Sequence, residues 1–337
     1  MLYFMSGNMN DKFLYINTER KKGRYVNPEA TTVKRGILSL ILWKLGFFKD
    51  KTINDLVCDK CSFSVNNNKS SINKVAWINH ATFLIEIDGI NILTDPTWSD
   101  TCSPVFFIGP KRTHPPGIGL DKLPKIDYVL VSHNHYDHLD KKTVKKLNKL
   151  FPSIKWIVPS GIKKWFKKQN IINVDELKWW EEVSYNHKNG KIKIHSVPSQ
   201  HFSGRRTIDL NRTLWSGFVV EFESCKQTKR VYFVGDSGYN DIYFNAIGEK
   251  FDKIDLSLIP IGTYSPRRFM KPIHVNPEEA VKIHNQVKSS LSIGMHWKTF
   301  RLSDEPIDHP PIALKEALKN SDNSNFIVVE PGEYVNW

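Results

Sequence analysis

Cysteine is scarce in this sequence, with four residues among 337. So few cysteines cannot form the dense disulfide framework of a small secreted protein, so we expect a reducing compartment. Cys58 and Cys61 form a CxxC pair, but the sequence has no second pair that would complete a tetrahedral zinc site. We therefore interpret this pair as incidental.

A hydrophobic run long enough to cross a bilayer is also missing, since such a helix needs about 20 apolar residues. The most apolar stretch, residues 37–48, is shorter and is flanked by lysine and arginine. It is typical either of a helix lying among lipid headgroups or of a segment packed on the main domain, and both interpretations stay open. Residues 1–9 lack the features of a secretory signal, so we expect a cytoplasmic protein that associates peripherally with a membrane.

Acidic residues are outnumbered, because 35 Asp and Glu face 48 Lys and Arg, which gives a formal net charge of +13. This balance indicates attraction to a polyanion, such as nucleic acid, anionic lipid or a phosphorylated substrate. The first 51 residues hold ten Lys or Arg and four Asp or Glu, and so carry +6 of that charge. We expect residues 1–73 to form a basic N-terminal segment and residues 74–337 to form the main domain.

Short β-type runs begin at Lys74 and recur through both halves of the chain, separated by turn residues such as Asp88-Gly89. The expected strands are residues 75–78, 82–87, 90–93, 156–158, 192–197, 216–222 and 231–234. The expected helices are residues 141–150 and 162–169, and one that begins at Asn276-Pro277. Strand-rich stretches followed by helices, twice over, predict an α/β fold in which two mixed sheets pack face to face with helices outside, an αββα sandwich.

The densest group of metal-binding side chains follows the apolar run 126–131 and reads SHNHYDHLD. Because side chains alternate along an extended backbone, His133 and His135 point the same way and can share one metal ion. Asp137 and His138 follow past the bend and can face a second ion. A lone HxH is common in polar loops, but HxHxDH directly after an apolar strand indicates a metal site. The pattern resembles the signature of the metallo-β-lactamase superfamily, most of whose members are two-metal hydrolases.

A two-metal site needs further ligands, and isolated His or Asp residues at the ends of later strands are the candidates. His201, Asp236 and His296 fit, since each follows an apolar run. We predict that one metal is held by His133, His135 and His201, the other by Asp137, His138 and His296, and that Asp236 bridges both. Open coordination positions then remain for water and substrate. The mostly imidazole ligands favour two Zn²⁺ per chain over magnesium, with iron and manganese as alternatives.

The other histidines differ from this set. His80 lies in a turn on the same side of the sheet, so we expect it to support a metal ligand. The histidines that we interpret as ordinary surface or core residues are His114, His187, His195 and His309.

A series of longer motifs runs in order through nearly the whole chain: KGRYVNP, NHATFLIE, LTDP, GPKR, SHNHYDHLD, PSQH, GDSGY, PIGTYSPRRFM, HVNPEEAVKIH and MHWKTF. In number, order and spacing they resemble the N-acylphosphatidylethanolamine-hydrolysing phospholipase D family. The resemblance implies an αββα zinc enzyme that binds membranes and releases N-acylethanolamine and phosphatidic acid. It also implies a homodimer.

The resemblance places the family's metal ligands on the seven residues named above. It implies that Tyr136 and His274 lie near the bound phosphate, and it makes Tyr264 and Arg267 further candidates for substrate binding. We expect Asp137, Asp236 and His274 to be catalytic, with Asp137 orienting the attacking hydroxide and accepting its proton. Cations for the lipid surface are expected from Arg267, Arg268, Lys111 and Arg112.

Three functions remain open. The first is a phosphodiesterase acting on phospholipid at a membrane surface. The second is a nuclease, or another phosphoester or lactone hydrolase, of the same superfamily. The third is a non-catalytic membrane-binding protein. Nucleic acid is disfavoured because the positive charge is concentrated beside an apolar, aromatic segment and no RRM, KH or helix-turn-helix pattern is present.

Overall fold

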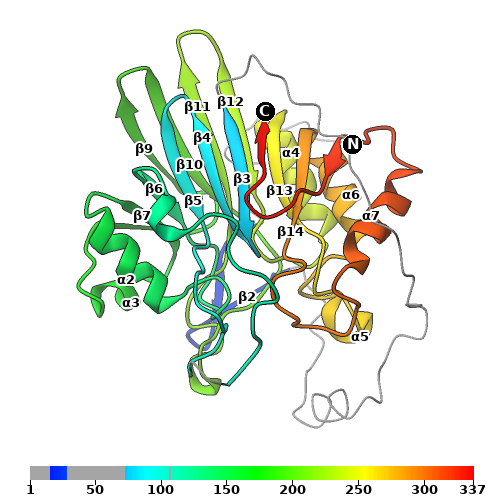
Figure 1. The fold of residues 1–337 in the computed structure, drawn as a ribbon, viewed down its shortest axis with the longest axis horizontal. Coiled ribbons are helices and arrows are strands. Elements are labelled where there is room, and N and C mark those ends of the chain that lie inside the picture. The colour runs from blue at the N-terminus through cyan, green and yellow to red at the C-terminus, as the bar shows by residue number, and fades with distance from the viewer. Residues whose placement is uncertain (1–15, 29–72, 106–107) are drawn as a thin grey trace, which may run out of the picture.

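Two seven-stranded sheets lie face to face, with the helices on their outer sides (Figure 1). The computed structural model describes residues 16–28, 73–105 and 108–337. Each sheet combines antiparallel hairpins with parallel strands. The predicted αββα sandwich of two mixed sheets is therefore confirmed.

The first sheet begins with antiparallel strands and continues with parallel ones. Its order is β16 (Tyr334–Asn336), β3 (Lys74–Asn79), β4 (Thr82–Ile87), β5 (Ile90–Thr94), β6 (Tyr128–Leu130), β7 (Lys155–Pro159) and β8 (Val174–Leu177). The crossovers of its parallel half contain η1 (Leu120–Lys122), α2 (Lys141–Leu150) and α3 (Lys163–Lys167). Asp140 caps α2 by accepting a hydrogen bond from the backbone N–H of Lys142. Helix α2 buries Thr143, Val144 and Leu147 at helical spacing against this sheet.

The second sheet comes from the C-terminal half of the chain. Its order is β15 (Phe326–Ile327), β14 (Ser289–Met295), β13 (Ile254–Pro260), β12 (Thr228–Phe233), β11 (Gly217–Ser224), β10 (Gly190–Val197) and β9 (Glu182–His187). Its helices are α4 (Asp241–Phe251), α5 (Arg267–Met270), α6 (Pro277–Gln286) and α7 (His309–Leu318), and η2 (Thr207–Asp209) lies in the loop after β10. Asn276 caps α6 in a capping box with Glu279, and Pro277 is at the first turn, as predicted.

The apolar core fills the space between the two sheets. Large side chains that are wholly buried there include Phe83 of the first sheet and Phe218 and Phe233 of the second. Burial of apolar surface is the main favourable term in folding. The strand ends lie outside this apolar core, so they can carry polar side chains.

Part of the predicted N-terminal segment packs on this domain. The hairpin of β1 (Glu19–Lys21) and β2 (Arg24–Val26) is joined to it by Ile16 and Tyr25, which pack with Trp179 and Trp215. The apolar stretch 37–48 and the CxxC pair lie outside the described residues, so the division at residue 73 stays a prediction. None of the helices in the described residues combines the length and the hydropathy that a membrane span requires.

Candidate metal centre

The ends of several strands meet at one edge of the sandwich, and the predicted ligands lie on the loops that follow them. The HxHxDH motif follows β6, His201 follows β10, Asp236 follows β12 and His296 follows β14. Rigid sheets hold such loops in fixed relative positions. The structure brings all seven predicted ligands into one cluster, from positions up to 163 residues apart in the chain.

The first group consists of three histidine rings. The Nε2 atom of His133 lies 2.8 Å from Nδ1 of His135, which lies 3.3 Å from Nε2 of His201. His133 and His201 are buried and His135 is half-buried. The three ring nitrogens are mutually within 4.8 Å, which is close enough for one ion to contact all of them.

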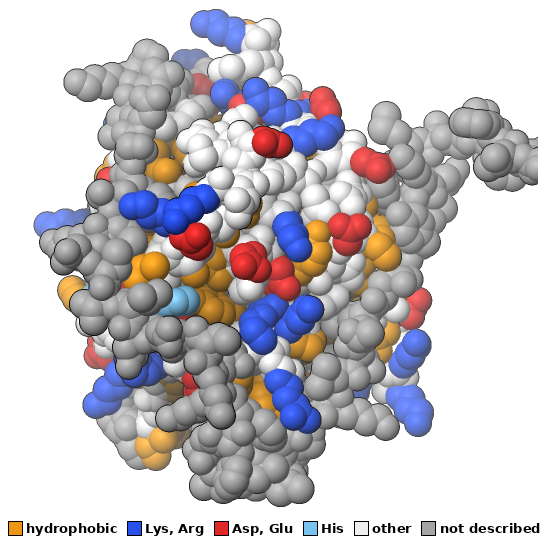
Figure 2. Space-filling view, turned by 90° about the vertical axis from the view of Figure 1, so that its right-hand side faces the viewer, with side chains coloured by type: hydrophobic (Ala, Val, Ile, Leu, Met, Phe, Trp, Pro, Cys, Tyr) orange, Lys and Arg blue, Asp and Glu red, His pale blue; other side chains and the backbone are white. Residues whose placement is uncertain are grey.

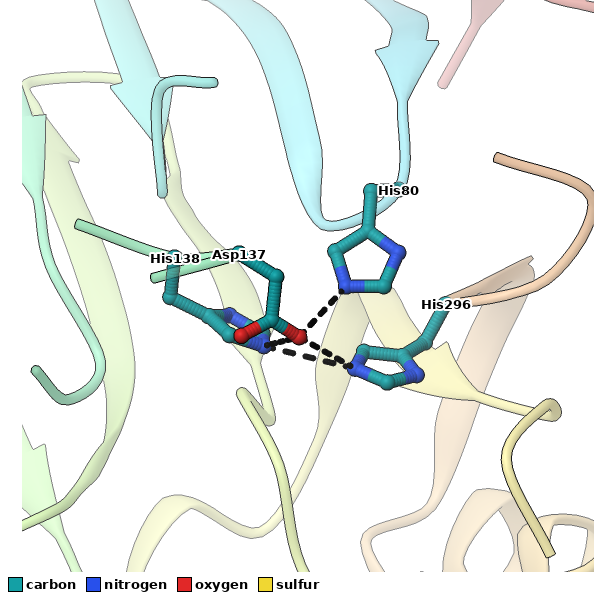
Figure 3. Close-up of side chains that lie close together, drawn as sticks. All are labelled: His80, Asp137, His138 and His296. Atoms are coloured by element: carbon teal, nitrogen blue, oxygen red, sulfur yellow. Dashed lines mark hydrogen bonds and ion pairs between the residues drawn. The ribbon is translucent and has the colours of Figure 1, made fainter. Parts of the chain in front are cut away.

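The second group joins Asp137, His138 and His296 (Figure 3). The Oδ2 atom of Asp137 lies 3.3 Å from Nε2 of His138 and 3.7 Å from Nε2 of His296. The two ring nitrogens are 3.3 Å apart. Both rings are buried, so their polar atoms face one another rather than solvent.

Asp236 lies between the two groups. Its Oδ1 is 3.1 Å from Nε2 of His296, and its Oδ2 is 3.2 Å from Nε2 of His138. The same Oδ2 is 3.6 Å from Nε2 of His201 and 3.8 Å from Nε2 of His133. One carboxylate thus reaches ligands of both groups.

The outward-facing nitrogens of His133 and His138 are anchored by Asp95. The Ser132 hydroxyl donates to Asp95 Oδ2 at 2.5 Å, so the Ser132 oxygen accepts from Nδ1–H of His133 at 2.9 Å. His138 donates from Nδ1 to Asp95 Oδ2 at 2.6 Å, and the Ser132 backbone N–H donates to Oδ1 at 2.7 Å. In its neutral form each ring therefore carries its proton on Nδ1 and aims the lone pair of Nε2 into the cluster.

The outer nitrogens of His201 and His296 have acceptors as well. His201 donates from Nδ1 to the carbonyl oxygen of Ile273 at 2.9 Å. Nδ1 of His296 is 3.1 Å from the hydroxyl oxygen of Thr263. The loop that carries Thr263 is in turn held by the buried Glu305 carboxylate, which accepts from the backbone N–H of Thr263 at 2.6 Å and of Ser265 at 2.9 Å.

This arrangement fits metal ions. Ring nitrogens whose outer partner is an acceptor present lone pairs inward, and lone pairs that face each other at about 3 Å repel unless a proton or a cation lies between them. Imidazole nitrogens with a few carboxylate oxygens are the donor set of zinc and related transition metals. The seven residues can therefore bind metal, with outer hydrogen bonds of the kind that orient metal-binding histidines.

Protonation differs between the two groups. Burial lowers the pKa of His133 and His201 well below the ordinary histidine value and lowers the pKa of His135 to about 4, so these rings are neutral at pH 7. Burial also opposes protonation of His138 and His296, but the carboxylates of Asp236 and Asp137 outweigh it. They raise the pKa of His138 well above its ordinary value and that of His296 to about 9. A metal ion would displace these protons.

Metal-free protein is expected to become less stable as the pH rises from about 6.5 to about 9. The folded pKa of His296, about 9, exceeds the ordinary value of 6.5, so its stabilisation is complete below pH 6.5 and is lost as the pH passes the folded value. Metal ions replace the protons, so the metal-loaded protein should not show this loss. Thermal unfolding of chelator-treated and reconstituted protein over this range measures the difference. Parallel curves for the two forms would contradict the assignment.

His80 joins the second group, as its predicted supporting role requires. It is wholly buried in the turn between β3 and β4, and its Nε2 lies 3.1 Å from Oδ2 of Asp137 (Figure 3). Its ring centroid is 3.9 Å from that of His296. Burial and the adjacent His296 lower the pKa of His80 to about 3, so the ring is neutral and donates a hydrogen bond from Nε2–H to Oδ2 of Asp137.

Replacing His80 with phenylalanine should keep the ring packing and remove the donor to Asp137. We expect kcat to fall by about 10-fold with little change in KM. Loss of a hydrogen-bond partner of a metal ligand typically lowers metal affinity or activity by about 10–100-fold. Steady-state kinetics measure this. His187→Phe is the matched control because His187 bonds to Tyr128 outside the cluster. Equal kinetics for the two variants would remove His80 from the site.

The predicted phosphate-contacting residues occupy different positions. The buried His274 borders the cluster, with its ring centroid 5.2 Å from that of His201 and 5.3 Å from that of His296. The half-buried Tyr136 has the guanidinium of Arg205 3.9 Å above its ring, and its hydroxyl donates to the Arg205 carbonyl oxygen at 3.2 Å.

Three of the remaining predicted side chains are already engaged with the protein. The Tyr264 hydroxyl bonds to Nδ1 of His309. Arg267 donates from Nη2 to both carboxylate oxygens of Glu279, at 2.9 and 2.7 Å, and from Nη1 to the carbonyl oxygen of His274 at 2.9 Å. Arg112 donates to the carbonyl oxygens of Thr97 and Ser99. Arg267 and Arg112 thus position protein groups, which differs from the predicted role of cations directed at lipid. Lys111 and Arg268 are exposed.

Asp95 is the residue that sequence reasoning missed. It directly follows β5 in the motif LTDP and is wholly buried, yet Asp95-Pro96 is also a common way for a strand to lead into a turn. The rule that identified the seven predicted ligands, a His or Asp at a strand end, applies to it equally. Applying that rule to every strand would have included it.

Comparisons with known proteins agree with this geometry. A family model described as a beta-lactamase superfamily domain matches residues 90–297. A metallo hydrolase from Ignicoccus hospitalis has a similar fold, with a TM-score of 0.56 and 20% identity over 78% of this chain and 97% of that one. The N-acyl-phosphatidylethanolamine-hydrolyzing phospholipase D 1 of Caenorhabditis elegans is 45% identical over 267 residues, which cover 76% of this chain and 74% of that protein. The mitochondrial protein of that name from Saccharomyces cerevisiae is 36% identical over 244 residues, or 71% of this chain and 50% of that protein.

Fold and site together define a metal-dependent hydrolase of the metallo-β-lactamase superfamily. Within that superfamily, the chain belongs to the N-acylphosphatidylethanolamine-hydrolysing phospholipase D family.

Proposed function

We propose that this protein hydrolyses the phosphodiester of N-acylphosphatidylethanolamine-type phospholipids at a membrane surface, releasing N-acylethanolamine and phosphatidic acid. The observation that carries the proposal is the convergence of seven His and Asp side chains in a chain that is 45% identical to a protein named for that reaction. The proposal includes two zinc ions, peripheral attachment to a cytoplasmic membrane surface and a homodimer.

The residues have distinct roles in holding metal. His133, His135 and His201 would hold one ion, and Asp137, His138 and His296 the other, with Asp236 in contact with both groups. When bound, the ions would neutralise the anionic phosphodiester and lower the pKa of a bound water to about 7. Asp95, Ser132, Thr263 and the carbonyl of Ile273 keep the histidine tautomers in the state that binding requires.

Asp137 is the candidate to orient the attacking water. Although burial alone would raise its pKa, the adjacent His138 lowers it well below the usual range, so the side chain is ionised and accepts hydrogen bonds. A hydrogen bond from Nε2–H of His80 holds Oδ2 of Asp137 in place. His274 lies at the border of the cluster and Tyr136 lies under Arg205 in the HxHxDH loop, and both would supply polar groups to the phosphate or the departing ethanolamine oxygen.

The test is product identification combined with metal analysis. Purified protein is incubated with vesicles that contain N-acylphosphatidylethanolamine and, separately, with RNA. We expect N-acylethanolamine and phosphatidic acid from the vesicles and intact RNA. Cleaved RNA would favour the nuclease alternative, and no product from either would favour a non-catalytic membrane-binding protein. Zinc at two ions per chain is expected, whereas iron or manganese would correct the cofactor.

A further inference from the structure

A second cavity lies beside the metal centre, on the side of α2 and α3. Its volume is about 850 Å³. Its walls are the loop after β5 (98–104), the start of α2, the end of α3 and the loop 205–209. The metal-binding histidines do not line it. Tyr136, from the HxHxDH motif, does, so the cavity borders the loop that carries His133, His135, Asp137 and His138.

The lining of this cavity is strongly basic. It includes six cations against three carboxylates, and the cations are Lys141, Lys142, Lys146, Lys168, Arg205 and Arg206. Among the described residues, no carboxylate forms an ion pair with Lys141, Lys146, Lys168 or Arg206, all of which are exposed. These four side chains are therefore available to an anion.

Two of the three carboxylates already accept hydrogen bonds from the protein. Asp140 accepts from the backbone N–H groups of Lys142 and Ser99 and from the Thr143 hydroxyl, at 3.1, 3.0 and 2.5 Å. Asp209 accepts from the backbone N–H groups of Arg205 and Arg206, at 2.9 and 2.8 Å. Their charge is directed at backbone dipoles rather than at the lysine side chains, so the cavity stays positive.

Arg205 makes the wall towards the metal centre rigid. Its guanidinium covers the Tyr136 ring and donates to the carbonyl oxygens of Asn134 at 2.9 Å and Leu139 at 2.8 Å. Both carbonyls belong to the loop that contains the HxHxDH motif. An anion in the cavity would thus be held next to that loop.

Exposed aliphatic side chains border the same cavity. Ile208, which lines it, is 66% exposed, and the nearby Leu210 is 46% exposed. Ser103 and Pro104 also line it, and they are followed directly by Val105, which is 40% exposed. Aliphatic side chains in water beside unpaired lysines are typical of a surface that enters the lipid headgroup region.

A different face of the molecule has another character. On the described part of the side that carries α5, α6 and α7, acidic and basic side chains are interspersed (Figure 2). The α2 and α3 side differs from this face, because there the exposed cations and aliphatic side chains gather around one cavity.

We propose that this cavity binds the phosphate headgroup of an anionic phospholipid other than the substrate, so that the protein docks on anionic membrane with its metal centre beside the bilayer. Lys141, Lys146 and Lys168 contact the phosphate, and Ile208 and Leu210 enter the headgroup region. The inference extends the proposed function by naming the surface lipid. It concerns binding and needs no turnover.

The test is cosedimentation of the full chain with vesicles that lack N-acylated lipid. Vesicles of phosphatidylcholine alone are compared with vesicles of phosphatidylcholine and phosphatidylglycerol. The triple variant Lys141→Gln, Lys146→Gln, Lys168→Gln should bind the anionic vesicles about 100-fold more weakly, because each cation near such a surface contributes several-fold. The matched control is Lys145→Gln, Lys149→Gln, Lys164→Gln, which removes the same charge from the same helices outside the cavity. The control should retain most of the affinity.

Each other result overturns the inference. Equal losses in both triple variants would mean that only overall charge matters. Saturable binding of inorganic phosphate that the cavity variant abolishes, without preference for anionic vesicles, would identify a soluble phosphate ligand. Binding to RNA that depends on the same three lysines and exceeds vesicle binding would identify a nucleic-acid site. Because no substrate is present, these results are independent of whether the proposed hydrolysis takes place.

Discussion

Replacing Asp236 with alanine is expected to remove bound metal and nearly all hydrolysis. Its two carboxylate oxygens lie within 3.2 Å of His296 and His138, and Oδ2 also faces His201 and His133. Both ligand groups therefore lose a contact at once. Removal of a hydrogen-bond partner of a metal ligand usually lowers activity by about 10–100-fold. The loss of kcat/KM in the Asp236 variant should be larger. Metal content of the purified variant and its turnover of N-acylated phospholipid measure the two effects.

The variant must be shown to fold before this result is interpreted. Circular dichroism and gel filtration of chelator-treated wild type provide the reference, because both proteins then lack metal. Asp121→Ala is a suitable control, since Asp121 is exposed on η1 and its only described ion pair is with the neighbouring Lys122. Two metal ions per chain and normal activity in the Asp236 variant would refute the assignment of this carboxylate.

The cluster of seven His and Asp side chains was predictable because its members follow a local rule. HxHxDH lies directly after a buried strand, and His201, Asp236 and His296 each end an apolar run. The strands of a sandwich end at common edges. Residues that directly follow different strands can therefore lie close together in space, even when they are far apart in the sequence.

Features that depend on partners distant in the sequence were not predictable in the same way. Arg267 was expected to be a cation at the lipid surface, but its pairing with Glu279 is set by how α5 meets α6. The role of Thr263 depends on the contact between its loop and Glu305. The basic cavity likewise requires α2, α3 and the loop after β10 to come together, which no single motif encodes.

Strand prediction failed where the apolar pattern is mixed. Residues 254–260 form β13, in the middle of the second sheet, yet Asp255, Ser257 and Pro260 interrupt the run. Ser257 is wholly buried between two parallel neighbours, where its small side chain fits. Tertiary packing thus makes this segment a strand although its own strand propensity is low.

Replacing Asp95 with asparagine should weaken metal binding by about 100-fold, although Asp95 is not itself one of the seven ligands. Its carboxylate accepts from the Ser132 backbone N–H, the Ser132 hydroxyl and Nδ1–H of His138. An amide offers one acceptor oxygen and places N–H groups against one of these donors. His138 then loses its fixed tautomer directly and His133 loses it through Ser132, and each disturbed ligand is worth about 10–100-fold in affinity.

Asp127→Asn is the matched control for Asp95→Asn, because Asp127 lies at the opposite end of the same sheet and accepts from the backbone N–H of Asn91 at 3.1 Å. Both variants should lose about 1–3 kcal/mol of stability for each buried donor left without a partner. Only Asp95→Asn should release metal to a competing chelator at concentrations that leave the wild type loaded. Equal metal retention in the two variants, both folded, would mean that the Asp95 hydrogen bonds stabilise the fold without orienting the metal-binding histidines.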